Sequence, residues 1–197
     1  GQRVVDVRLA LVSAFVAVTD VFSVGTVQPR KNYARLMEAL AMLGPSAAHV
    51  HLVIAGGRGW LDSPIYGAVK TLGLEGRVHF TGFVADDDLP ALYSDALCLA
   101  YPSLYEGFGF PVLEAFACET PVVTSKLSSM PEVAGDAALL VDPYDVAALS
   151  VALGRLLSEP DLRTELVARG KRQVAQFTWQ RTARDLRAVY ERLAPGK

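Results

Sequence analysis

Short apolar runs alternate with longer stretches of helical periodicity along most of the chain. Six runs have the length of strands, and most are apolar at consecutive positions; they are Val21–Gly25, His49–Ala55, Val78–Thr81, Ala96–Tyr101, Pro121–Thr124 and Ala137–Val141. Continuous apolar runs are typical of strands that are buried on both faces. The pattern therefore predicts a parallel sheet of about six strands, with helices on both faces.

Helical patterns fill the intervals between these runs. Asn32 is expected to cap the first helix, which Gly44 and Pro45 would end. The other expected helices are one that opens at Ser63–Pro64 and stops at Gly73, Asp86–Ser94, Pro111–Cys118, and one that Asp145 caps and that runs through Leu157. Repeated β–α units with short connections predict a doubly wound, Rossmann-like α/β domain, whose ligands bind beyond the carboxyl ends of the strands.

The two ends of the chain depart from this alternation. Pro160–Phe177 and Thr178–Leu193 are helical patterns with no strand between them. We assign residues 21–197 to one domain and residues 1–20 to an N-terminal segment of uncertain role. Leu9–Val18 within that segment is strongly apolar, but it is too short to span a bilayer, and as a signal peptide it lacks a clear small-residue cleavage site.

The composition of the 197 residues is that of an ordinary soluble globular protein, with 51% hydrophobic residues and a formal charge of −2. No broad basic stripe exists, so a nucleic-acid or anionic membrane surface is not expected. Cys98 and Cys118 each lie in an apolar segment, which favours core thiols of a reduced, cytoplasmic protein over a disulfide. The three histidines have no partners at metal-ligand spacing, so no metal site is expected.

The stretch from Glu106 to Glu114 carries the clearest chemical signal. Gly107 and Gly109 leave backbone N–H groups open to a ligand, and Pro111 suits the first turn of a helix. Phosphate oxygens would meet these amides and the positive end of the helix dipole. Carboxylates accept hydrogen bonds from vicinal hydroxyls, so the two glutamates suit a phosphate that is bonded to a ribose on one side and to a hexose on the other.

Two further segments follow predicted strands. Arg30 and Lys31 stand where two cations could neutralise a diphosphate leaving group, although adjacent basic residues in a loop more often have no such role. Gly56–Gly59 looks like a dinucleotide fingerprint, but Asp62 replaces the last glycine of G-x-G-x-x-G. This departure disfavours a Rossmann dehydrogenase, and we interpret the segment as a loop that helps to wall the ligand site.

Together these motifs resemble the donor-binding domain of the retaining GT-B glycosyltransferases of group one (family-four-like), which include many bacterial mannosyl- and glucosyltransferases. The resemblance runs from about Val21 to the C-terminus, and besides the E-x7-E stretch it rests on Gly25–Asn32, Leu52–Gly57, His79–Val84 and Pro131–Gly135. It implies one GT-B half, which binds a nucleotide sugar and transfers a hexose of the mannose or glucose type with retention.

The resemblance also implies roles for individual residues. Glu106 and Lys31 would be catalytic, with Glu106 on the sugar hydroxyls and Lys31 on the phosphate, while Glu114 would bind the ribose. Val84 and Asp86 would hold the nucleobase, although Asp86 also suits the N-cap of the next helix. The full donor-binding set is Arg30, Lys31, Val84, Asp86, Glu106, Gly107, Phe108, Gly109, Phe110 and Glu114. No cofactor and no metal are implied, and GDP-mannose is the favoured donor, with a UDP-sugar second.

The same resemblance implies a second, acceptor-binding domain that this chain does not contain. Family members carry an N-terminal Rossmann-like domain that binds the acceptor, and this chain has no room for it, so donor binding with little or no turnover is expected. Any membrane association would come through that absent domain, at the inner membrane face. Two alternatives stay open: a nucleotide-sugar-binding module without catalysis, and a GT-B nucleotide-sugar isomerase. Thr26 and Glu119 depart from the family pattern, which often has arginine and glycine there.

Overall fold

The structure, a computed structural model, describes residues 20–194. Its six strands are β1 (Val21–Val24), β2 (Leu52–Ala55), β3 (Val78–Gly82), β4 (Cys98–Tyr101), β5 (Val122–Ser125) and β6 (Leu139–Val141). They form one parallel sheet in the order β3-β2-β1-β4-β5-β6. Because β4 pairs with β1 rather than with β3, the strand order reverses between β1 and β4, as in doubly wound folds. The predicted fold class is confirmed.

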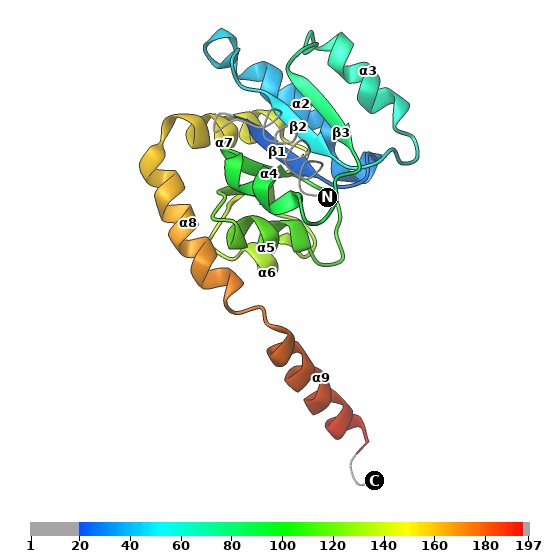
Figure 1. Cartoon of the computed structure of the whole chain (residues 1–197), viewed down its shortest axis with the longest axis vertical. Helices are drawn as coiled ribbons and strands as arrows, with labels where there is room; N and C mark the ends of the chain where they lie inside the picture. Colours follow the sequence, from blue (N-terminus) through cyan, green and yellow to red (C-terminus); the bar gives the residue numbers. More distant parts are fainter. Residues whose placement is uncertain (1–19, 195–197) are drawn as a thin grey trace, which may run out of the picture.

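Helices cover both faces of this sheet (Figure 1). One face carries α2 (Tyr33–Met42), α3 (Ser63–Thr71) and α7 (Val146–Ser158), and the other carries α4 (Leu89–Asp95), α5 (Phe110–Ala117) and α6 (Met130–Ala134). Two short 3-10 helices, η1 (Pro29–Lys31) and η2 (Pro45–Ala47), stand in the connections. The four helices predicted between strands and the one predicted after the last strand are present, whereas α6 was not predicted as a helix.

The strands are buried on both faces, which explains their continuous apolar sequences. In β2, Leu52 and Ile54 belong to the hydrophobic cluster under α2, α3 and α7, while Val53 and Ala55 belong to the cluster under α4, α5 and α6. All four residues are at most 1% exposed. Burial of each large aliphatic side chain contributes about 1.5–3 kcal/mol to the free energy of unfolding. The sheet is therefore a stable support for the loops at its edges.

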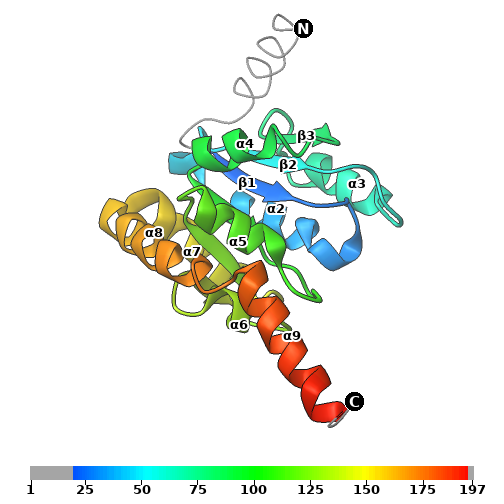
Figure 2. The same cartoon turned by 60° about the horizontal axis from the view of Figure 1, so that its bottom comes forward.

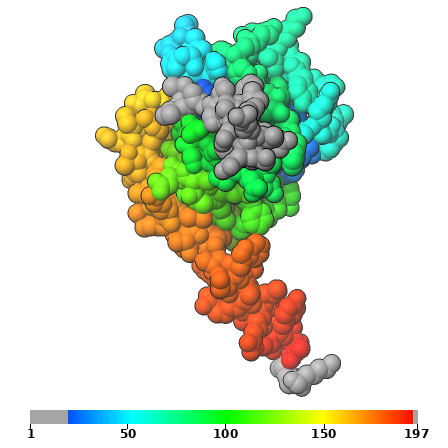
Figure 3. All heavy atoms as spheres, in the orientation of Figure 1, coloured from blue at the N-terminus to red at the C-terminus, as the bar shows by residue number. Residues whose placement is uncertain are grey.

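The C-terminal helices differ in how they relate to this core. The helix α8 (Pro160–Val174) contacts α5 and α7, whereas α9 (Trp179–Leu193) projects away from the body of the molecule (Figures 1 and 2). Thr178 caps α9 by accepting a hydrogen bond from the amide of Arg181 at 3.1 Å, and the helix begins one residue after the predicted boundary at Thr178. No residue of α9 is buried, and the helix stands out as a tail in the space-filling view (Figure 3).

Some sequence predictions concern the N-terminus and the cysteines. The apolar segment Leu9–Val18 lies outside the described residues, and no helix among residues 20–194 is long and apolar enough to cross a membrane. Cys98 is fully buried, and burial raises the pKa of its thiol to about 12, as expected for a core thiol. The same prediction is wrong for Cys118, which follows α5 at the edge of the core and is partly exposed.

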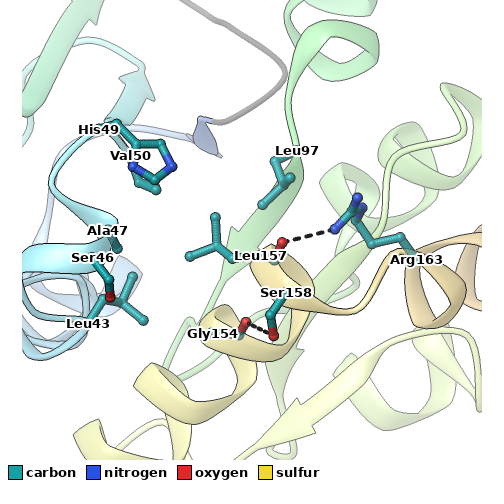
Figure 4. Close-up of a pocket in the computed structure, with 10 residues that line it drawn as sticks. All are labelled: Leu43, Ser46, Ala47, His49, Val50, Leu97, Gly154, Leu157, Ser158 and Arg163. Carbon is teal, nitrogen blue, oxygen red and sulfur yellow. Dashed lines mark hydrogen bonds between the residues drawn. The ribbon is translucent and has the colours of Figure 1, made fainter.

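A cavity of about 480 Å³ lies at the amino ends of the strands, and its lining is drawn in Figure 4. Arg163 donates hydrogen bonds to the carbonyls of Leu156 and Leu157, at 2.5 and 3.3 Å, and Ser158 donates to that of Gly154 at 2.9 Å. These bonds satisfy carbonyls in the last turns of α7, where intrahelical partners run out. Arg163 and Ser158 therefore bond to the end of a helix.

Candidate functional site

The predicted site residues lie beyond the carboxyl ends of three strands. The helix η1, which holds Arg30 and Lys31, follows β1; Val84 and Asp86 follow β3; the loop with Glu106 follows β4 and leads into α5. Because β1 and β4 are neighbours, the loops that follow them meet at the reversal of strand order. The structure thus brings the two cations to the first glutamate, as the sequence predicted for one shared site.

Glu106 is held by three side chains. Its Oε1 atom lies 2.9 Å from Nζ of Lys31 and accepts a hydrogen bond from the hydroxyl of Tyr101 at 2.8 Å, and its Oε2 atom bonds to Arg30. The side chains of Lys31 and Glu106 are 9% and 10% exposed. A Cβ at Gly25 would lie 2.7 Å from Cε of Lys31, so a side chain there would have to displace the end of this lysine. Sequence reasoning missed Tyr101, which ends an apolar strand.

The charges of this cluster favour a further anion. Burial raises the pKa of Glu106, but the hydrogen bonds from Lys31 and Arg30 outweigh it and hold the pKa below its usual value. Burial lowers the pKa of Lys31, and the hydrogen bond to Glu106 opposes that effect. Two cations therefore face one carboxylate, which leaves positive charge in excess. Buried charges are tolerated when they are paired, and the excess is available to a ligand.

The N-terminus of α5 adds hydrogen-bond donors beside the cluster. Gly109, its N-cap residue, has a φ of 117°, and Pro111 stands in the first turn as predicted. Within residues 20–194, the amides of Gly107, Phe108 and Gly109 donate no hydrogen bond to the protein. A Cβ at Gly109 would displace the end of the Met130 side chain, and the positive φ favours glycine at this position. Open amides at a helix N-terminus form an anion-binding arrangement.

The loop after β5 supports the loop that carries Glu106. The hydroxyl of Ser128 accepts a hydrogen bond from the amide of Glu106 and donates one to its carbonyl, both at 2.9 Å. The hydroxyl of Ser129 lies 2.6 Å from the carbonyl of Phe108 and 3.0 Å from that of Glu106. Neither serine was among the predicted site residues, although their position at a strand end, just before Pro131, is a signal that could have marked them.

Asp86 and Glu114 face a neighbouring cavity of about 460 Å³, which is lined by Asp86, Leu89, Pro90, Tyr93, Glu114, Ala117 and Cys118. Glu114 is exposed, and its Oε2 atom accepts a hydrogen bond from the hydroxyl of Tyr93 at 2.7 Å. Burial raises the pKa of Tyr93 well above its usual value, so this hydroxyl stays a donor. The structure therefore places Glu114 apart from the cations, on the wall of its own pocket.

A smaller pocket of about 200 Å³ shares Asp86 and Leu89 with this cavity, and its other lining residues include Gly25, Thr26, Gly56, Gly57, Phe83 and Val84. The amide of Val27 bonds to the carbonyl of Gly57 at 2.9 Å, which ties the loops after β1 and β2 together. The prediction that Gly56–Gly59 helps to wall the site is supported for Gly56 and Gly57, whereas Gly59 is not among the lining residues. Val84 and Asp86 thus lie on a pocket next to the cations.

Of the predicted helix caps, that of Asp145 on α7 is confirmed, that of Asn32 holds in position only, and that of Asp86 is wrong. Asp86 does not cap α4, because the helix begins at Leu89 and Asp88 occupies the N-cap position. Asn32 occupies the N-cap position of α2, but its side chain makes no capping bond. Its Nδ2 atom donates instead to the carbonyls of Pro102 and Pro143, at 3.1 and 2.7 Å. Asn32 has a φ of 62°, a conformation that asparagine tolerates, and it ties the loops after β4 and β6 together.

The two departures from the family pattern lie at the surface. Thr26 is exposed on the rim of the smaller pocket, and the Arg30 guanidinium lies on Glu106 beside Lys31. Glu119 is exposed as well, pairs with Lys171 at 2.7 Å and has a φ of 60°. Among the described residues, no group of three or more histidine, cysteine or acidic side chains could hold a metal ion.

The fold and the site define the class of protein: a doubly wound α/β domain with two cations, a carboxylate and open helix amides gathered at its strand reversal. The family model described as "Glycosyl transferases group 1" matches residues 17–173. The chain belongs to this family.

Two curated relatives are mannosyltransferases. The chain is 43% identical, over 159 residues, to the O-antigen chain mannosyltransferase B of Escherichia coli, covering 80% of this chain and 42% of that protein. It is 39% identical, over 135 residues, to the MMP alpha-(1->4)-mannosyltransferase of Mycolicibacterium hassiacum, covering 66% of this chain and 33% of that protein. The chain thus spans less than half the length of these relatives.

Solved structures agree with this assignment. The sucrose-phosphate synthase of Thermosynechococcus elongatus superposes with a TM-score of 0.77 and 32% identity, over 88% of this chain and 45% of that one. Anabaena Alr3699/HepE, solved in complex with UDP and glucose, superposes with a TM-score of 0.76 over 93% of this chain and 51% of that one. The latter likeness, at 24% identity, concerns the fold.

Proposed function

We propose that this chain is the donor-binding half of a retaining hexosyltransferase. The carrying observation is the buried pair of Lys31 and Glu106, joined by Arg30, at the reversal of strand order and next to the open amides of α5. A diphosphate would find two cations and a helix N-terminus in one place, and a sugar attached to it would find a carboxylate. The mannosyltransferase relatives support a mannose-type donor.

In this proposal each group has a chemical task. Lys31 and Arg30 stabilise the negative charge that builds on the diphosphate as the glycosidic bond breaks, and the N-terminus of α5 shares in that stabilisation. Glu106 accepts hydrogen bonds from sugar hydroxyls and so fixes the orientation of the hexose. Glu114 accepts hydrogen bonds from the ribose in the neighbouring pocket, on the oxygen that Tyr93 does not fill.

The pocket with Asp86 supports guanine as the base. Guanine presents two adjacent donors, N1–H and the N2 amino group, which a carboxylate can accept together. Uracil presents one N–H between two carbonyl acceptors, and a carboxylate disfavours those carbonyls. GDP-mannose is therefore the proposed donor, and a UDP-sugar is second.

A calorimetric comparison of GDP, UDP and ADP, each free and as its mannose or glucose conjugate, tests the proposal on the 197-residue chain. We expect GDP and GDP-mannose to bind most tightly. Tighter binding of the uridine series would reverse the assignment of the base but keep the site. Absence of binding by every nucleotide would refute the donor-domain function.

Transfer itself requires more than the donor site. In the proposed arrangement the acceptor and the sugar must be held in close approach, and the residues described here account for the donor side. We expect the purified chain to show little or no sugar transfer, and an added N-terminal acceptor domain to restore it. Efficient multiple turnover by the chain alone would contradict this half-enzyme proposal, and product analysis would separate transfer from isomerisation.

A further inference from the structure

The connection between β5 and α6 makes hydrogen bonds to the backbone around Glu106. Ser128 binds both main-chain polar groups of Glu106, and Ser129 binds the carbonyls of Glu106 and Phe108. These two serines come from a different loop than the cations, which follow β1. Glu106 is therefore anchored twice: by its side chain to Lys31, Arg30 and Tyr101, and by its main chain to the serine pair.

The backbone of Ser128 indicates that this contact is specific. Its φ of 55° lies in the left-handed region, which is unfavourable for a residue with a side chain. Ser128 is also exposed, so apolar packing does not hold it there. In this conformation its hydroxyl reaches the amide and the carbonyl of Glu106 at once, and it also accepts a hydrogen bond from the amide of Ser129 at 2.6 Å. The hydrogen bonds offset the strain.

The two sets of anchors would respond differently to a diphosphate. A diphosphate would compete with Glu106 for Lys31 and Arg30, because all three charges lie in one cluster. The side-chain anchors of Glu106 would then weaken when its carboxylate meets the sugar, whereas the serine contacts involve no cation and would persist.

We propose that Ser128 and Ser129 are positioning residues, which keep the Glu106 carboxylate and the Gly107–Gly109 amides in place for a nucleotide sugar. This inference rests on the proposed donor-binding function and adds two residues to it. Because the diphosphate contacts of Lys31 and Arg30 do not depend on the serines, their loss weakens binding of the sugar more than binding of the diphosphate.

The test uses two variants. Ser128→Gly removes the hydroxyl and keeps the left-handed backbone accessible. Ser129→Ala removes the other hydroxyl and takes the place of Ser128→Gly if that variant is unstable. Calorimetry with GDP-mannose and with GDP is the readout. We expect a loss of about tenfold for GDP-mannose and of less than about threefold for GDP. Glu119→Gly is the matched control, since it replaces another exposed residue with positive φ, on a different loop, and leaves both affinities unchanged.

Amide hydrogen exchange in the absence of nucleotide separates this inference from the proposed function. The Glu106 amide donates to Ser128, so Ser128→Gly should exchange faster at Glu106 while the core strands keep their rates. Unchanged exchange, or faster exchange with unchanged GDP-mannose affinity, would overturn the positioning role. If the unmutated chain bound no nucleotide, the donor-binding function would fail and the positioning role with it, whatever the exchange rates.

Discussion

The two glutamates of the Glu106–Glu114 stretch have different surroundings, although they belong to one short motif. Glu106 lies in a loop, is nearly buried, and is bonded to two cations and a tyrosine hydroxyl. Glu114 lies on α5, is exposed, and is bonded to the hydroxyl of Tyr93. The first glutamate pairs with two cations from the connection after β1, whereas the second pairs with an uncharged hydroxyl from the neighbouring helix α4. In the proposed function, Glu106 therefore binds the hexose at one end of the nucleotide sugar, and Glu114 binds the ribose at the other.

Replacement of Lys31 by methionine should have the largest effect, because it removes the buried cation on the Glu106 side. We expect the affinity for GDP to fall by about 1.5–3 kcal/mol, the range for hydrogen bonds to charged groups. Stability should fall as well, since Glu106 keeps only Arg30 as its cation. Calorimetry and urea unfolding measure the two effects, and Lys70→Met, at an exposed lysine of α3, is the control. An unchanged GDP affinity would reject the diphosphate role.

The carboxylates themselves sharpen the comparison when each is changed to its amide. Glu106→Gln should weaken the nucleotide sugar but not free GDP, because its proposed partner is the hexose. Glu114→Gln should weaken both ligands, because both contain the ribose. Each loss is expected to be on the order of 1–3 kcal/mol by calorimetry. Equal effects of both variants on both ligands would remove the division of labour and leave the site intact.

A smaller effect is expected from Tyr93→Phe, which removes the hydroxyl that donates to Glu114. The affinities for GDP and for GDP-mannose should fall together by about 0.5–1.5 kcal/mol, since the change loosens one carboxylate that both ligands share. Tyr66→Phe, on α3 at the other face of the sheet, is the control. A loss confined to GDP-mannose would place Glu114 on the sugar instead.

Acid should remove the contribution of the Glu106 carboxylate to the stability of the fold. The pKa of Glu106 is lower in the folded chain than its ordinary value of 4.5, so its stabilising contribution is present above pH 4.5 and is lost as the pH falls through the folded pKa. Urea unfolding from pH 7 downward should show a loss of stability below pH 4.5 that is smaller in Glu106→Gln. Identical pH profiles of the variant and the parent would contradict the assigned pKa direction.

Much of this molecule follows from local sequence. The six strands were predictable because buried parallel strands need continuous apolar runs, and Gly109 and Pro111 marked the start of α5. The missed contacts of Ser128 and Asn32, and the hydrogen bond that Lys31 donates to the hydroxyl of Tyr101, join segments that are distant in sequence. They depend on which strands are neighbours, and hydrophobic periodicity does not specify strand order. The same dependence explains why Asn32 was expected to serve its own helix.

Gly25 has a consequence for how the sequence can change. Any Cβ there would lie 2.7 Å from Cε and 2.9 Å from Nζ of Lys31, so positions 25 and 31 are sterically coupled. A side chain at position 25 would displace Lys31, although no charged residue of the site had been substituted. We therefore expect Gly25→Ala to weaken the cation cluster without removing any of its charged groups, both by crowding Lys31 and by straining a backbone with a φ of 130°.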